Sequence, residues 1–237
     1  KSREFVITKD IEVSLNIIGA SFDPGKEVFI KGNAKKKNGQ LLNGFVEASI
    51  DGLNQSIFAS SKEGNFNFSF SLSSSLKTGN YELKVRVYEK DSAGWIANEG
   101  FTSSIIKISQ IIGKIEIAID SQNIIPGNSL VYRILLYDQA GLQTKDDVGV
   151  IFYLPDESVF SKKLVKSGES IQIPLALNAS PGYWLIESKW RELSAKRTFF
   201  VVEVENVSMK IENQTLIITN IGNVHYRKTL EFSIGEE

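Results

Sequence analysis

Apolar and polar residues alternate one by one along most of this 237-residue chain, and no other feature constrains its fold as strongly. Phe66, Phe68 and Phe70 fall on one side of an extended segment, with Asn67 and Ser69 on the other. A period of two places successive side chains on opposite faces of a half-buried β-strand. The alternation returns at residues 81–87, 115–119, 130–136, 148–154 and 171–177. No window of eleven or more residues keeps the spacing of an amphipathic helix, so the sequence predicts an all-β fold.

Turn signals separate the alternating segments at short intervals. Pro-Gly, Asn-Gly or Asp-Gly pairs stand at residues 24–25, 38–39, 51–52, 126–127 and 181–182. Such pairs favour tight turns, because Pro presets φ and Gly accepts positive φ. Short strands separated by these turns are typical of a β-sandwich or barrel.

The pattern of turns and strands occurs twice. Its matched landmarks are the Pro-Gly turns at 24–25 and 126–127, the hairpin glycines Gly39 and Gly141, the strand-opening glycines Gly79 and Gly182, and the tyrosines Tyr81 and Tyr183. A unit of about 100 residues is the size of an immunoglobulin-like sandwich. The sequence therefore predicts tandem immunoglobulin-like antiparallel β-sandwiches at residues 1–110 and 111–204.

Residues 205–237 predict a partial third β unit at the C-terminus. Apolar runs at 207–211, 216–219 and 229–234 are expected strands, with a turn at 220–223. Three strands do not close a sandwich and leave long edges open. We interpret the segment either as the start of a third sandwich or as a strand segment used in assembly, because an open edge accepts a strand from another chain.

Charge and cysteine content exclude several classes of function. Lys and Arg number 27 against 28 Asp and Glu, which argues against nucleic acid as a partner because phosphate binding needs a basic surplus. The sequence has no cysteine, so disulfides, cysteine nucleophiles and thiolate metal sites are excluded. No stretch reaches the ~18–20 apolar residues of a membrane helix. Membrane attachment is therefore expected only through a segment outside this chain.

Side chains for catalysis are scarce. His225, in a turn of the third unit, is the only histidine, so neither a Ser-His-carboxylate triad nor a zinc site is expected. The adjacent acids Asp146 and Asp147, like Asp156 and Glu157, are interpreted as turn formers and not as a glycosidase pair. We therefore predict that the chain is not an enzyme and has no catalytic residue, metal site or cofactor.

Tryptophans are the remaining candidates for ligand contact. Trp184, Ile186 and Trp190 share one face if residues 183–190 form a regular strand, and core packing is the favoured interpretation for them. Trp95 instead lies in the expected loop at 91–100, beside two glycines. It is the predicted ligand contact, by stacking against a sugar ring.

Five Asn-x-Ser/Thr sequons bear on the compartment, and they begin at Asn54, Asn67, Asn178, Asn206 and Asn213. Asn67 falls opposite the phenylalanine stripe, and Asn178 precedes the turn at 181–182, so both are expected to be exposed. Exposed sequons favour N-glycosylation and an extracellular or cell-surface location. Together with the absence of cysteine, they favour the envelope of an archaeon.

The run from a Pro-Gly turn through an Asn-Gly hairpin to the segment 77–85 resembles the macroglobulin-type, immunoglobulin-like repeats of prokaryotic cell-surface proteins. Residues 216–234 resemble the start of adhesion-associated sandwich repeats of archaeal secreted proteins. The first resemblance covers most of residues 11–204. It implies a spacer, an adhesion stalk or an S-layer-associated protein, and no chemistry.

These observations predict a non-catalytic, cell-surface or secreted structural or adhesion protein whose modules act as spacer or assembly units in a stalk, filament or S-layer. Its expected partners are other surface proteins or copies of itself, with glycans as a further possibility. The alternatives are a carbohydrate- or ligand-binding accessory module of a larger secreted protein, and an accessory domain of a macroglobulin-type protease or protease inhibitor.

Overall fold

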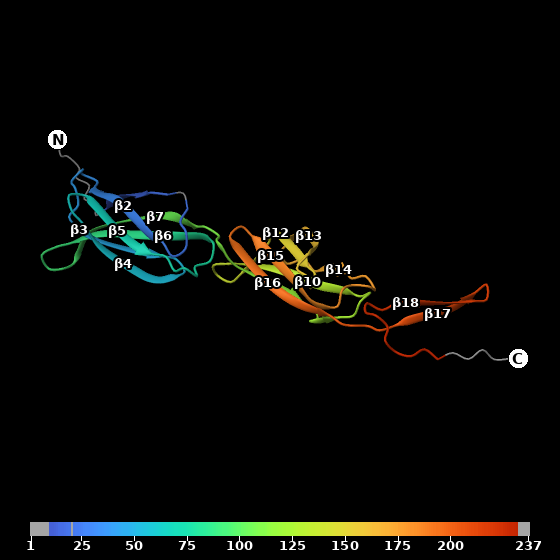
Figure 1. The fold of residues 1–237 in the computed structure, drawn as a ribbon. Helices are drawn as coiled ribbons and strands as arrows, with labels where there is room; N and C mark the ends of the chain where they lie inside the picture. The colour runs from blue at the N-terminus through green and yellow to red at the C-terminus, as the bar shows by residue number, and fades with distance from the viewer. Residues whose placement is uncertain (1–9, 20, 232–237) are drawn as a thin grey trace, which may run out of the picture. The chain divides into compact units, whose positions relative to one another are not determined.

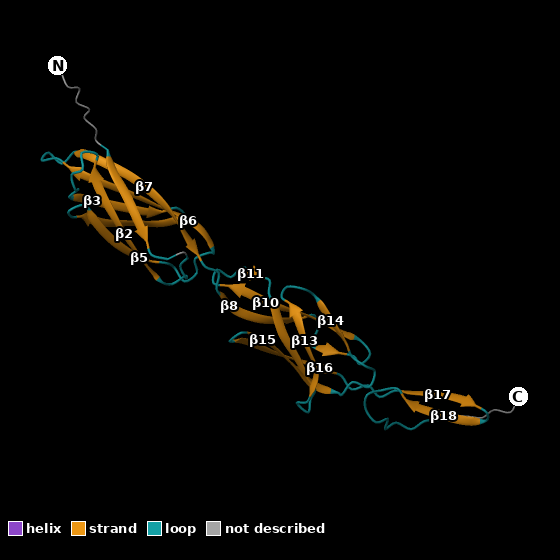
Figure 2. Cartoon of the chain, turned by 90° about the horizontal axis from the view of Figure 1, so that it is seen from above, coloured by secondary structure: helices purple, strands orange, loops and turns teal. Residues whose placement is uncertain are grey.

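A computed structural model describes residues 10–19 and 21–231, which form strands, turns and loops and no helix (Figures 1 and 2). The all-β prediction is confirmed. The chain divides into two compact units. The N-terminal unit comprises the residues up to Ile111 together with 139–141, and the C-terminal unit comprises 112–138 and the residues from 142 onward. None of the described residues forms a helix able to cross a membrane.

Two antiparallel sheets face each other in the N-terminal unit. The smaller sheet has the order β1-β2-β5, with bounds Ile11–Ile17, Glu27–Lys36 and Asn65–Ser71. The larger sheet has the order β4-β3-β6-β7, with bounds Leu53–Ser61, Gly44–Ile50, Gly79–Lys90 and Ile96–Ile108. Alternate side chains of both sheets meet in one core.

The phenylalanine stripe lies in this core, as its alternation predicts. Phe66, Phe68 and Phe70 on β5 are buried, while Asn67 and Ser69 are exposed. Full burial of one such side chain stabilises the fold by about 1.5–3 kcal/mol. Opposite Phe66, β2 carries a glycine, and a Cβ at Gly32 would stand 2.1 Å from the ring. The glycine therefore makes room for the ring.

The C-terminal unit has the same strand order. Its smaller sheet joins β8, β10 and β14, with β11 also on β10, and their bounds are Ile112–Ile119, Ser129–Asp138, Ile171–Pro174 and Gln143–Thr144. Its larger sheet runs β13-β12-β15-β16-β9, with bounds Val159–Lys166, Asp147–Tyr153, Gly182–Trp190, Leu193–Val201 and Asn123–Ile124.

A short parallel contact recurs at the same place in both units. In the C-terminal unit β9 pairs parallel with β16. In the N-terminal unit Phe22 donates to the carbonyl of Lys107 and accepts from the amide of Ser109, each at 2.9 Å. Both units share a layer of three strands packed on a layer of four, to which the C-terminal unit adds the short strands β11 and β9. This arrangement and connectivity make each unit an immunoglobulin-like β-sandwich.

One residue match expected from the sequence is wrong. Gly79 and Gly182 open equivalent strands and are 103 residues apart, so the structural counterpart of Tyr81 is Trp184 and not Tyr183. Tyr81 packs against the N-terminal core, and Trp184 is buried in the C-terminal one. Tyr183 is 69% exposed and lies on the opposite face. Both strands therefore carry an inward-facing aromatic ring, but in the C-terminal unit this ring lies one position later in the chain than the tyrosine match implied.

β17 (Val207–Glu212) and β18 (Thr215–Asn220) form a separate two-stranded hairpin. Its tip residues Asn213 and Gln214 both have positive φ, as a tight two-residue hairpin turn requires. The third strand expected at 229–234 is not formed in residues 229–231, and 232–234 lie outside the described residues. The Asn223 side chain bonds to the backbone of Val202, Val204 and Ala179, which holds the chain at the sandwich end instead of beside β18.

Candidate functional site

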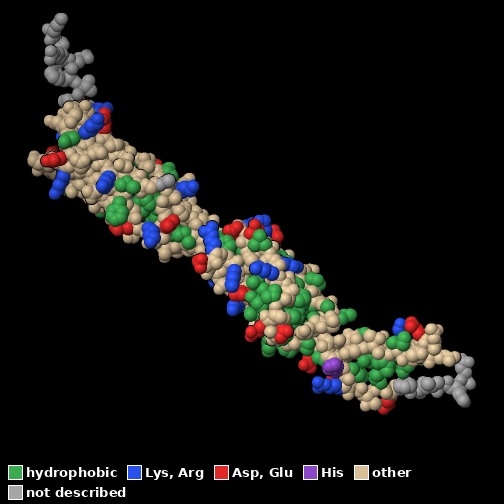
Figure 3. All heavy atoms as spheres, turned by 45° about the horizontal axis from the view of Figure 1, so that its top comes forward, with side chains coloured by type: hydrophobic (Ala, Val, Ile, Leu, Met, Phe, Trp, Pro, Cys, Tyr) green, Lys and Arg blue, Asp and Glu red, His purple; other side chains and the backbone are tan. Residues whose placement is uncertain are grey.

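The outer surface of the β4-β3-β6-β7 sheet carries exposed aromatic side chains. Phe58 is 71% exposed, Phe101 67% and Phe45 49%, and Tyr88 and Ile105 stand on the same side of the sheet. We call these five residues the aromatic face. Figure 3 shows that hydrophobic side chains reach the surface of this unit among charged ones. Large apolar groups that remain in water on one surface mark an interaction site.

Strand register places one residue from each of the four strands in a row across this sheet. Phe58 on β4 is opposite Glu47 on β3, Glu47 is opposite Arg86 on β6, and Arg86 is opposite Phe101 on β7. Directly opposite residues have Cβ atoms about 4.5–5.5 Å apart, so the four side chains are neighbours in the order of the strands. The row therefore has an aromatic ring at each edge and a charge pair at its centre.

Arg86 is held in place by both charges and rings. Its Nε and Nη2 donate to Glu99 Oε2 at 3.1 and 2.7 Å, and Nη1 lies 3.9 Å from Glu47 Oε2. The guanidinium also lies 5.1 Å from the centre of the Tyr88 ring and 5.8 Å from that of Phe101. Cation–π contacts of this kind orient the side chain. Arg86 is thus a fixed cation at the middle of an aromatic surface.

A shallow cavity of about 580 Å³ opens on the same surface. It is lined by side chains of both signs together with an aromatic ring, namely Glu47, Glu82, Lys84, Arg86 and Phe101. The adjacent Phe45 and Tyr88 rings stack with centres 5.5 Å apart. Such a surface suits a partner that supplies both apolar contact and charge.

The sequence contained a signal for this face that our sequence analysis missed. Apolar doublets interrupt the alternation at Phe45-Val46, Ile57-Phe58 and Ile105-Ile106. In a strand, one member of such a doublet must point to solvent. Two adjacent apolar residues on several neighbouring strands therefore indicate a sheet that is apolar on both sides.

The predicted ligand contact, Trp95, is 74% exposed at the β6–β7 hairpin. Asp91 shapes the turn, because its Oδ1 accepts from the amides of Ala93 and Trp95, both at 2.9 Å. The ring is therefore presented to solvent by an ordered turn.

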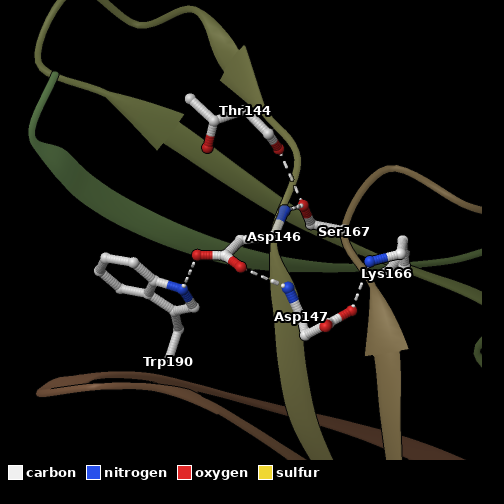
Figure 4. A network of polar contacts seen from close by, with 6 residues as sticks. All are labelled: Thr144, Asp146, Asp147, Lys166, Ser167 and Trp190. Atoms are coloured by element: carbon white, nitrogen blue, oxygen red, sulfur yellow. Dashed lines mark hydrogen bonds and ion pairs between the residues drawn. The ribbon is translucent and has the colours of Figure 1, made fainter.

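The two other tryptophans have packing roles. Trp184 is 1% exposed, and its Nε1 donates to the Ser180 carbonyl at 2.8 Å. Trp190 packs at the edge of the core and donates to Asp146 Oδ2 at 2.9 Å (Figure 4). Arg191 lies over the Trp190 ring at 4.6 Å. The core-packing interpretation holds fully for Trp184 and partly for Trp190.

Asp146 and Asp147 make structural hydrogen bonds in a small network (Figure 4). Asp146 accepts from Trp190 and from the Asp147 amide, and these two donors lower the pKa of its carboxyl group. Asp147 pairs with Lys166 Nζ at 2.8 Å, while Ser167 bridges the strand end. Asp146 therefore ties the start of β12 to the end of β15, and Asp147 ties β12 to β13.

His225 is exposed after the β17–β18 hairpin (Figure 3). Among the described residues, no group of three or more His, Asp or Glu side chains is arranged to hold a metal ion. Asp156 accepts from the amide and hydroxyl of Ser158, at 3.0 and 2.6 Å. This is the turn-forming geometry expected for that acid.

Four sequon asparagines are exposed: Asn67 on β5, Asn178 in a turn, Asn206 before β17 and Asn213 at the hairpin tip. Asn54 belongs to β4, and its side chain lies outside the described part of the structure. Glycosylation at these positions stays a prediction.

Fold and surface together define an immunoglobulin-like β-sandwich protein with an exposed aromatic sheet face. No protein-family model matches the sequence, and no curated protein matches it. Similar solved structures include the adhesin InvE of Yersinia pseudotuberculosis, with 10% identity and a TM-score of 0.40 over 80% of this chain. The Escherichia coli adhesin FdeC has 13% identity and a TM-score of 0.41 over 80% of this chain. This chain covers 58% of the first adhesin structure and 64% of the second.

The amphioxus IgVJ-C2 molecule is also similar, with 11% identity and a TM-score of 0.36. That match covers 76% of this chain and 98% of the other.

Proposed function

We propose that this chain is a non-catalytic structural or adhesion module of a cell-surface or secreted protein, acting through protein contacts made by its sheet faces. Its immunoglobulin-like units would space and present these contacts along a larger assembly. The observation that carries the proposal is the aromatic face of β4-β3-β6-β7, where Phe58 and Phe101 remain about two-thirds exposed.

Composition of this face supports protein contact. Aromatic side chains and arginine are enriched in the centres of protein interfaces, because they bury large areas and the rings lose few rotamers. Here Arg86 is already oriented by Glu99 and two rings, so binding would order it little further. Preorganisation of this kind favours affinity.

An envelope location is supported by the exposure of four sequon asparagines. The absence of cysteine from the sequence bears on the origin and favours a prokaryote. A prokaryotic surface, and among prokaryotes an archaeal one, fits both.

Labelling of cells tests this proposal directly. An antibody against the purified chain should label intact cells of the source organism as strongly as permeabilised ones. Intact-mass spectrometry of the native protein should show added hexose-containing mass, one part of which is lost on Asn67→Gln. Labelling confined to permeabilised cells would reject the surface location.

Carbohydrate binding is a second candidate, favoured by the exposed Trp95 ring at an ordered turn. A flat indole in water can stack on the apolar face of a sugar. Binding on a glycan array that is lost with Trp95→Ala but kept with Phe29→Ser, a change to an exposed ring on the other sheet, would establish it.

A further inference from the structure

The aromatic face is laid out symmetrically about the line between β3 and β6. From one edge, its central row reads Phe58, Glu47, Arg86, Phe101: an aromatic ring, an acid, a base and an aromatic ring. Consider a two-fold axis that runs along this line, in the plane where two copies would meet. A half-turn about this axis generates a second copy whose face lies over the first. Phe58 then meets Phe101 of that copy, and Glu47 meets its Arg86.

The flanking rows fit the same operation. Phe45 and Tyr88 are opposite each other across the midline, so each meets the other's ring in the second copy. At the sheet edges of that row, Glu99 meets Ser60. In the row on the other side, Lys84 meets Ser49. No two like charges face each other in these three rows.

We propose that this face binds the same face of a second copy of this chain, giving a two-fold symmetric, sheet-on-sheet pair. The inference rests on the proposed contact function and names its partner. A two-fold interface requires a self-complementary surface. This face is self-complementary because its rings face rings and its acid faces its base. Sheets pack face to face with side chains interdigitating, and the exposed rings of this face are available for such packing.

The corresponding sheet of the C-terminal unit fails the same operation. Its matching row is Leu164, Gly149, Lys189 and Ser194, which would set Leu164 against a serine and Lys189 against a glycine. The next row would place Lys162 against Lys196. Self-complementarity is therefore a property of the N-terminal face and does not follow from the strand order.

Charge reversal provides the sharpest test, by sedimentation velocity on the full chain. Wild type should show a concentration-dependent dimer. Glu47→Arg sets two arginines against each other, and Arg86→Glu sets two acids against each other, so each variant alone should dimerise about 30-fold more weakly or worse. An equimolar mixture of the two should restore a heterodimer, because each bad pair becomes a good one. The double reversal in one chain should self-associate again.

Controls separate association from folding. Thermal unfolding should show that each variant is folded, since Arg86 also pairs with Glu99 within its own chain. If either reversal unfolds, Phe58→Ser and Phe101→Ser replace it, each weakening the dimer without rescue on mixing. Phe29→Ser removes a ring that is 59% exposed on the other sheet and should leave the dimer intact.

Two results would overturn the inference: a wild-type chain that stays monomeric up to about 0.5 mM, or a dimer that survives both reversals. A monomer that labels intact cells, and loses a surface partner on Phe58→Ser, would keep the contact function and reject the second copy as its partner. A dimer found only inside cells would support the pairing and reject the surface function.

Discussion

The outer faces of the two larger sheets differ although the sheets share one strand order. In the N-terminal unit the central row holds Phe58 and Phe101 at its edges, whereas the matching row of the C-terminal unit has Leu164 and Ser194 there. Beneath each sheet lies a core of buried hydrophobic side chains. Inward positions are thus fixed by packing, and outward positions are free to carry function.

Polar groups on the C-terminal face are paired with one another. Glu187 accepts from the Tyr153 hydroxyl at 3.0 Å and lies 3.3 Å from Lys189 and 3.9 Å from Lys196. Charges are thus paired within the chain on both faces, and the difference lies in the edge rings Phe58 and Phe101, which the matching C-terminal row lacks. A row with a ring at each edge is therefore a feature of one unit and not of the fold.

The largest expected effect is in the core. Trp184→Ala should lower the free energy of unfolding by about 3–5 kcal/mol, because the ring is buried and its removal leaves a cavity. The neighbouring Tyr183→Ala, on the exposed side of the same strand, should cost about 0.5 kcal/mol. Urea unfolding followed by circular dichroism measures both. Equal losses would contradict the inward and outward assignment.

A pair of glycines extends the comparison. A Cβ at Gly100 would stand 2.2 Å from the Ile11 carbonyl oxygen, so Gly100→Ala should destabilise the N-terminal unit by about 1–3 kcal/mol. Gly149 lies in the matching row of the C-terminal face, and a Cβ there would meet no atom nearer than 3.7 Å. Gly149→Ala should therefore be neutral or stabilising by up to about 1 kcal/mol. Calorimetric unfolding of both variants measures these changes, and a larger loss of stability in Gly149→Ala than in Gly100→Ala would contradict the prediction.

Much of the fold follows from the sequence, because the core faces obey the period-two rule. Phe66, Phe68 and Phe70 are buried as predicted, and the Pro-Gly turns precede equivalent strands. The tyrosine match failed, since a one-residue difference between the units moves every side chain to the other face. Glycine positions identified the true counterparts.

The candidate site was harder to predict. The aromatic face depends on which strands are neighbours, and Phe58 and Phe101 fall in one row, at its two ends, only through the order β4-β3-β6-β7. That order places residues more than forty positions apart in the chain on one face. Trp95 was predictable as exposed, because its loop carries its own turn signals.

Acid should weaken the C-terminal unit through Glu187. Burial by itself raises the pKa of this carboxyl, but the Tyr153 hydroxyl, Lys189 and Lys196 outweigh it, so the pKa is lowered in the folded state. A group with a lowered folded pKa contributes stability above its unfolded pKa of about 4.3, and that stability is lost as the pH falls through the folded value. Glu187→Gln should therefore flatten the fall in Tm between about pH 5 and 3. The exposed Glu192→Gln is the matched control, and an equal flattening there would exclude Glu187 as the cause.

The smallest effect is expected at the hairpin tip of the N-terminal unit. Trp95→Ala should change the free energy of unfolding by no more than about 0.5 kcal/mol, because the ring is 74% exposed and the Asp91 turn uses only backbone donors. Asp91→Ala should cost more, since it removes the acceptor of those amides. Trp95→Ala should also leave self-association unchanged, because the ring lies outside the three rows that face a second copy. If Trp95→Ala weakened the dimer in sedimentation velocity, the contact surface would include the hairpin as well as the sheet. The aromatic face would then not be the whole of the contact.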